Sequence, residues 1–201
     1  MAGRRAVIDA DTLYRRHARN VLVWHALEGL FQLHWSRRIL DETRRNLLLD
    51  ATRASPDHVE KVDRILSRVT EAIHAGGAGA EVPETEIASI ENEMTNDPKD
   101  RHVLAAAVAC GADTILTTNT RDFSLTTTTP HGVTARSPDE FLVSLLRPDT
   151  RDAALAALCN HAQFHRWSVP ELLALLGSSG PHGPAIAPSY VRLIKPSCQS
   201  R

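Results

Sequence analysis

The chain has 201 residues, of which 42% are hydrophobic and 23% charged, as expected for a globular protein with a sizeable core. Its formal net charge of −1 provides no global attraction to nucleic acid, so any nucleic-acid surface must be local. No apolar run approaches the roughly 20 residues of a membrane span and residues 1–9 lack a signal-peptide pattern, so we expect a cytoplasmic protein without a membrane segment.

The first predicted strand is Ala6–Ile8, which ends in Asp9 and is followed closely by Asp11. An acid that closes an apolar strand has no evident local backbone role, so Asp9 is a candidate functional residue. The apolar pattern next predicts an amphipathic helix over 20–31 and a short strand over 33–35.

Ser36 is a favourable N-cap for a helix that runs to residue 50 with one broadly apolar face. Glu42 lies at the edge of that face. It is either a functional carboxylate or a surface partner of Arg38 at i−4 or Arg45 at i+3.

Apolar residues at helical spacing predict a helix over 56–75, followed by a glycine-rich loop over 76–83 and a short helix over 84–93. Asp97 is a favourable N-cap for the next helix, and Asp100 lies in its first turn. Asp100 has two interpretations, because an acid at this position also interacts favourably with the helix dipole.

This alanine-rich helix, in which Pro98 fits the first position, can end at Gly111. A short buried strand over 113–118 follows and leads into Asn119 and Asp122. In a parallel sheet the start of a helix and the carboxyl end of the next strand lie at the same edge. The acidic groups at both ends of this unit should therefore converge with the end of the first strand.

The remaining pattern predicts a last strand over 133–135 and then three helices. Two of these helices begin with capping boxes. The predicted helices cover 137–146, 150–164 and 168–176, and a tail rich in glycine, proline and serine follows from Gly177.

Arginines cluster in two places, beside the first strand and on the helix that follows Ser36. Each cluster flanks a candidate acid, and each arginine either contacts RNA or belongs to a solvated helix face. The clusters consist of Arg15, Arg16, His17 and Arg19, and of Arg37, Arg38, Arg44 and Arg45.

Four segments resemble the PIN-domain nucleases and, more narrowly, the VapC-type toxins of bacterial toxin–antitoxin pairs. They are VIDADTLY at 7–14, WSRRILDETRRNLL at 35–48, DPKDRHVLAAAVACGADTILTTNTRDF at 97–123 and SPDEFL at 137–142. The resemblance implies an α/β, three-layer fold with a parallel sheet of four or five strands and helices on both faces. It places this PIN-like domain at 1–147 and a C-terminal helical extension with an irregular tail at 148–201.

The family's acidic positions fall on Asp9, Glu42 and Asp100. The last position falls on Asn119, where an aspartate is commoner, and Asp122 follows three residues later. We expect Asp9, Asp100 and Asp122 to be the metal ligands, with Asn119 assisting. Whether Asn119 or Asp122 completes the site is left open by the sequence.

The resemblance implies a divalent-metal-dependent endoribonuclease that uses Mg²⁺ or Mn²⁺. All-oxygen ligand sets suit these hard ions, which activate water and stabilise the leaving oxygen. It also implies an RNA substrate, inhibition by a cognate VapB-like antitoxin and assembly as a homodimer. Neither the RNA nor the antitoxin is identified by the sequence.

Two other functions fit parts of the pattern. Asp9 and Asp11 after an apolar strand resemble the paired aspartates of haloacid-dehalogenase phosphatases, with Thr117 or Thr118 as the strand-end hydroxyl. Asp11 is followed directly by Thr12 and Leu13, however, which is one residue short of that motif. A degenerate PIN fold that binds RNA or protein without cleavage is the second alternative, and the asparagine at position 119 favours it.

Overall fold

The computed structural model describes residues 3–49, 56–179 and 185–198. At its centre is a four-stranded sheet in the order β2-β1-β3-β4, with every neighbouring pair parallel. This confirms the predicted α/β fold with a parallel sheet. The strands are β1 Arg5–Ile8, β2 Gln32–His34, β3 Thr114–Leu116 and β4 Thr134–Arg136.

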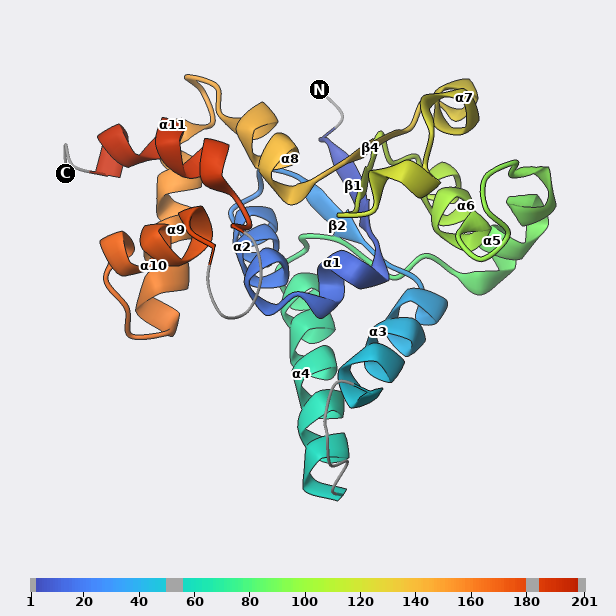
Figure 1. Ribbon diagram of the computed structural model, residues 1–201, viewed down its shortest axis with the longest axis horizontal. Helices are drawn as coiled ribbons and strands as arrows, with labels where there is room; N and C mark the ends of the chain where they lie inside the picture. The colour runs from blue at the N-terminus through green and yellow to red at the C-terminus, as the bar shows by residue number, and fades with distance from the viewer. Residues whose placement is uncertain (1–2, 50–55, 180–184, 199–201) are drawn as a thin grey trace.

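Helices cover both faces of the sheet and extend beyond its carboxyl edge (Figure 1). Helices α5 and α6 lie on one side, α2 and α8 with the C-terminal helices lie on the other, and α3 with α4 forms a projecting arm. The first helices are α1 Ala10–Tyr14, α2 Arg16–Leu27, α3 Arg37–Leu49, α4 Pro56–Ala75, α5 Glu84–Ile90 and α6 Arg101–Ala109. The later ones are α7 Leu125–Thr128, α8 Pro138–Leu145, α9 Arg151–Phe164, α10 Val169–Gly177 and α11 Pro188–Cys198.

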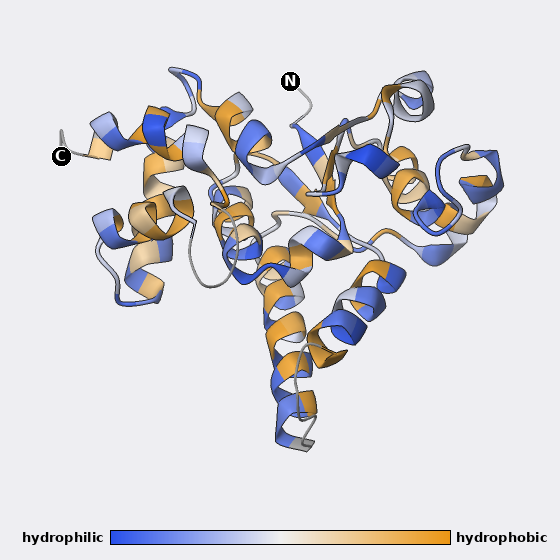
Figure 2. Ribbon diagram, in the orientation of Figure 1, coloured by the Kyte–Doolittle hydropathy of each residue, from blue (hydrophilic) through white to orange (hydrophobic). Residues whose placement is uncertain are grey.

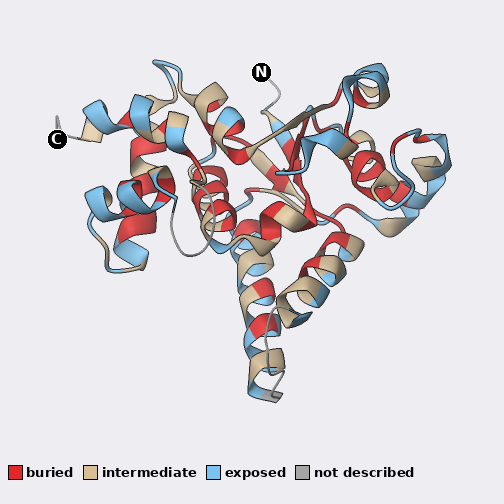
Figure 3. Cartoon of the chain, in the orientation of Figure 1, coloured by how far each residue is buried: buried red, intermediate tan, exposed pale blue. Residues whose placement is uncertain are grey.

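The core lies between the sheet and the helices on its two faces. All three residues of β3 are buried, and α6 is buried from His102 to Ala107 (Figure 3). Small alanine side chains let this helix lie close to the strands, and the apolar stripe of α4 faces α2 and α3 (Figure 2). Among the described helices, none is long and apolar enough to cross a membrane.

The N-terminal helices differ from the prediction. Helix α1 was not expected, and α2 spans Arg16–Leu27 instead of 20–31. The side chain of Asp9 accepts a hydrogen bond from the backbone N–H of Ala10 at 2.7 Å, so the chain turns into a helix directly after β1. The prediction relied on apolar periodicity, and a helix that begins through such a capping contact need not show that periodicity.

The start of α6 was also placed too early. The helix begins at Arg101, and Asp97 stabilises the preceding turn, in which its Oδ1 accepts from the N–H of Lys99 at 3.1 Å. Asp100 occupies the N-cap position, but its side chain caps no backbone N–H. Gly111 ends the helix at φ +65°, as predicted.

The glycine- and proline-rich tail contains α11, which its composition did not indicate. Two long-range contacts hold this helix in place. The carboxylate of Asp139 in α8 accepts from the N–H groups of Ser189 and Tyr190 at 3.2 and 2.8 Å. The hydroxyl of Tyr190 lies 2.6 Å from Nε2 of His25 in α2, whose Nδ1 lies 2.7 Å from the carbonyl oxygen of Val21.

Both groups of this His25–Tyr190 pair are fully buried, which generates a stability prediction. Tyr190→Phe should lower the free energy of unfolding by about 1–3 kcal/mol, because it leaves Nε2 of His25 without a partner in the core. Thermal and urea unfolding would measure this loss. Leu193→Ala on the same helix, at a side chain that is 46% exposed, should change stability little, and equal losses in both variants would contradict the role of the hydrogen bond.

Candidate active site

The candidate site lies where β1 and β3 end side by side. The chain leaves β1 for β2 on one side and returns to β3 on the other, and such a switch point is where open α/β sheets bind ligands. The N–H of Asp9 donates to the carbonyl oxygen of Leu116 at 3.0 Å, which extends the pairing by one residue. The Asp9 side chain is only 8% exposed, and its cap on α1 corrects the expectation that it lacks a local backbone role.

Thr117 joins the acids at this edge. Its hydroxyl donates to Oδ2 of Asp9 at 2.9 Å. Oδ1 of Asp11 lies 3.3 Å from the hydroxyl oxygen of Thr117. Asp11 also accepts from the backbone N–H and the hydroxyl of Thr118. Asp9 and Asp11 are thereby fixed to the end of β3 rather than free to rotate toward solvent.

Asp9 is a buried acid surrounded by other acids. Burial, followed by the charges of Asp11 and Glu42, raises the pKa of Asp9 to about 7, although hydrogen bonds from Thr117 and Ala10 oppose the shift. The carboxylate therefore carries its charge only at considerable electrostatic cost.

A second acidic group surrounds the start of α6. Asp100 and Asp122 share the cation of Lys99, whose Nζ lies 4.0 Å and 3.4 Å from their respective Oδ2 atoms. Asn119 donates from its amide nitrogen to Asp122. Burial raises the pKa of Asp100 to about 6 against the opposing charge of Lys99. Within the part of the chain that the structure describes, the buried Oδ2 of Asp100 accepts no hydrogen bond.

Glu42 lies between these two acidic groups. It contributes to the raised pKa of Asp9, and it lines a cavity of about 460 Å³ together with Lys99 and Asp100. The surface pair with Arg38 is absent, because that arginine binds Glu84 and Glu91 instead. The nearest cationic candidate for Glu42 is His102 Nε2 at 3.9 Å, and burial lowers the pKa of that histidine.

The donor atoms at this edge suit a hard divalent cation, since they are carboxylate, amide and hydroxyl oxygens. Oδ2 of Asp100 accepts no hydrogen bond from the described residues, and burial raises the pKa of Asp9, so added positive charge would be stabilising at both places. Within the described parts of the chain, however, no three acidic, histidine or cysteine side chains are close enough to form a metal centre as they stand.

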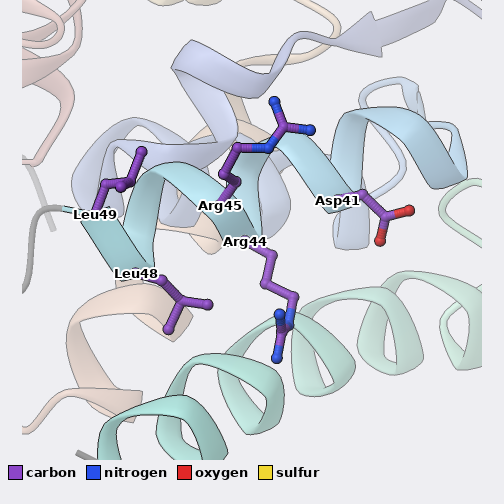
Figure 4. A pocket seen from close by; sticks show the side chains of 5 residues that line it. All are labelled: Asp41, Arg44, Arg45, Leu48 and Leu49. Carbon is purple, nitrogen blue, oxygen red and sulfur yellow. The ribbon is translucent and has the colours of Figure 1, made fainter. Parts of the chain in front are cut away.

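The arginines of the two predicted clusters divide into paired and available groups. Arg44 points toward α4 and binds Asp63, whereas Arg45 points to the opposite side of α3 (Figure 4). Arg45 lines the cavity of Glu42 and Asp100, and Arg15 lines a neighbouring cavity with Asp11. Arg38 also lines the cavity of Glu42 and Asp100, but it is paired with Glu84 and Glu91. Arg15 and Arg45 are thus the cluster members that border the acids without an ion pair to a described carboxylate.

A family model described as PIN domain matches residues 5–121, more than half of the chain. The chain belongs to the PIN domain family. A Mycobacterium tuberculosis protein named "Putative ribonuclease VapC50" is 47% identical over 53 residues, which are 26% of this chain and 31% of that protein. The chain thus matches about a third of the length of this curated relative. No solved structure matches the chain.

The PIN-domain match includes Asp9, Asp11 and Thr117, on which the haloacid-dehalogenase interpretation rests, and it replaces that interpretation. Two polar residues of the site, Thr117 and Lys99, have no role in the PIN-like site predicted from the sequence, where Thr117 appears only in the phosphatase alternative. Thr117 is the residue directly after β3, and a hydroxyl at a strand end was the available signal. Lys99 gave no signal, because its role depends on the approach of Asp122 from another segment.

The raised pKa of Asp9 generates a prediction about stability and pH. The folded protein retains this proton up to about pH 7, whereas the unfolded chain releases it near 3.8, so the stabilisation is fully present below pH 3.8, falls as pH rises from there, and is lost once pH has risen through 7. Asp9→Asn should therefore raise the melting temperature at pH 8 in the presence of chelator, by an amount equivalent to at most about 4 kcal/mol.

The difference between Asp9→Asn and wild type should shrink at pH 5, where Asp9 is already protonated. Glu86→Gln, which removes an exposed acid from α5, serves as the matched control and should leave the pH dependence unchanged. A destabilised Asp9→Asn protein at pH 8 would contradict the electrostatic account.

Proposed function

We propose that this protein is a divalent-metal-dependent endoribonuclease whose catalytic residues are Asp9, Glu42, Asp100, Asn119 and Asp122. The observation that carries the proposal is the buried carboxylate of Asp9, which faces other acids at the switch point of a PIN-domain sheet without a cationic side chain paired to it among the described residues. Such a group is costly to keep in a fold unless it acts on a ligand.

In this proposal Asp9, Asp100 and Asp122 hold Mg²⁺ or Mn²⁺. The bound ion would supply positive charge that activates a water molecule and stabilises the leaving oxygen of the phosphodiester. Thr117 keeps Asp9 oriented through its 2.9 Å hydrogen bond, and Asn119 orients Asp122. Glu42 lies between the two acidic groups, where it can accept a proton or position water.

Arg15 and Arg45 are the proposed phosphate contacts. Both are arginines, which bind phosphate oxygens in a forked geometry, and both line cavities that contain acids of the site. Because the net charge of the chain is −1, local contacts of this kind must provide the attraction to RNA.

The first functional prediction concerns metal-dependent cleavage. Purified protein should cleave single-stranded RNA with Mg²⁺ or Mn²⁺ and lose that activity in excess chelator. Asp9→Asn and Asp100→Asn should each reduce the rate by at least about a hundredfold, since each removes a proposed ligand charge. A gel assay with end-labelled RNA would measure the rates.

Asp149→Asn is the control for this experiment, because it alters an exposed acid on the loop before α9. It should cleave RNA at the wild-type rate. Cleavage that persists in chelator would refute metal dependence, whereas a protein that binds RNA but cleaves none under any divalent ion would support the degenerate PIN alternative. Lys99, already placed between Asp100 and Asp122, is the observation that favours this alternative.

We further propose that the protein is the toxin of a toxin–antitoxin pair, inhibited by a cognate VapB-like antitoxin and assembled as a homodimer. The proposal draws on the named Mycobacterium tuberculosis relative and on the local excess of acids at the site. An arginine or lysine of the antitoxin would form charge-assisted hydrogen bonds with these carboxylates and compete with the metal ion.

Expression in a bacterial host tests the toxin proposal. The wild-type protein should arrest growth, co-expression of an adjacent small antitoxin gene should restore it, and Asp9→Asn should be harmless at equal abundance because it cannot cleave RNA. Colony counts after induction, with protein levels checked by immunoblot, provide the measurement. Equal growth of wild-type and Asp9→Asn cultures would refute the toxin role without affecting the nuclease proposal.

A further inference from the structure

A second cavity, of about 720 Å³, lies between α2 and α4 and extends to the C-terminal end of α9. It is separate from the cavity of Glu42 and Asp100, because the two share no lining residue. Phe164 and His165 contribute to its wall, so the cavity is formed partly by the helices that follow the PIN match at 5–121.

The charged side chains that line this cavity are all cationic. Its described lining contains Arg16, Arg19, Lys61 and Arg68 and no aspartate or glutamate. Among the residues that the structure describes, none of these four cations forms an ion pair with a carboxylate. The cavity is therefore complementary to an anion.

Arg19 is the buried cation of this lining. The residue is only 5% exposed, and its Nη1 donates to the carbonyl oxygen of Leu13 at 2.8 Å, but its buried Nε has no hydrogen-bond partner among the described residues. Burial and the nearby charge of Arg16 lower the pKa of Arg19 to about 10. A buried guanidinium without a counter-ion is unfavourable, and an anion that enters the cavity would relieve this cost.

Aromatic rings stand beside these cations. Trp24 and Phe164 line the cavity with ring centroids 5.8 Å apart, and Phe164 is 70% exposed. Trp24 stacks on His161 at an interplanar angle of 19°, which supports its ring. Flat rings next to unpaired cations are the combination that binds a nucleobase and its phosphate.

Tyr14 connects this cavity with the candidate active site. It lines both the 720 Å³ cavity and a neighbouring cavity of about 400 Å³ that contains Asp11 and Arg15. We propose that the cavity between α2, α4 and α9 binds a nucleotide, with the base against Trp24 and Phe164 and a phosphate toward the cations Arg19 and Arg68. The bound nucleotide is either part of the RNA strand whose cleavage site lies at the acids or a free nucleotide. The first of these rests on the proposed function.

Equilibrium binding in chelator tests this inference without any contribution from cleavage. The probes are a fluorescein-labelled single-stranded RNA of about 12 nucleotides, followed by anisotropy, and adenosine 5′-monophosphate, followed by calorimetry. The variants are Phe164→Ala, at an exposed ring, and Arg68→Ala, at an exposed cation. The matched controls are Leu125→Ala and Arg192→Ala, which alter exposed residues outside the lining.

Both cavity variants should raise the Kd for at least one probe by about tenfold, the loss expected for one stacked base or phosphate contact, while both controls stay within about twofold of wild type. Weakened RNA binding identifies the strand as the source, and weakened binding of adenosine 5′-monophosphate alone identifies a free nucleotide. Circular dichroism would show that the variants retain the fold.

Unchanged Kd values for both probes would overturn the inference. It would also be overturned if an acidic peptide of alternating glutamate and leucine bound in a Phe164-dependent manner while neither nucleotide probe did. If the wild-type protein binds a nucleotide probe in a Phe164-dependent manner but cleaves no RNA, only the nuclease proposal is refuted. If the wild-type protein cleaves RNA but the cavity variants leave both Kd values unchanged, only the inference of a nucleotide in this cavity is refuted.

Discussion

The parallel pairing of β1 with β3 is the constraint on which the candidate site depends. Its register sets Ile8 opposite Leu116, so the two strands end level with each other. Asp9 and Thr117 then leave the sheet side by side and join through the 2.9 Å hydrogen bond. A shift by one residue would turn Asp9 toward a face of the sheet and leave its carboxylate among apolar side chains.

Burial makes the charged forms of the acids in the candidate site unfavourable. Desolvation raises the pKa of both Asp9 and Asp100, while the hydrogen bond from Thr117 and the charge of Lys99 oppose these shifts. The fold thus stabilises each acidic group partially, by a hydroxyl in one case and by an exposed cation in the other. Incomplete compensation is characteristic of sites that bind a ligand, because full neutralisation would leave no affinity for one.

The C-terminal helices are physically continuous with the sheet domain. Tyr190 and Ile194 of α11 belong to the same hydrophobic core as Ile8 and Leu22, and Asp139 caps α11 from α8. These helices therefore help to hold α2 in position. Because α2 also lines the cavity between α2, α4 and α9, packing of the C-terminal helices and formation of that cavity are coupled through one helix.

Local patterns in the sequence determined the identity of most elements and of the acids. The apolar run before Asp9, the helical spacing over 56–75 and the capping box at Ser137 each depend on neighbours within a few residues, and the structure has the strand and both helices. Contacts between distant segments were decided only by the tertiary structure. Such contacts set α11 through Asp139 and placed Lys99 between acids, and neither leaves a periodic trace because each joins residues that approach only after the chain has folded.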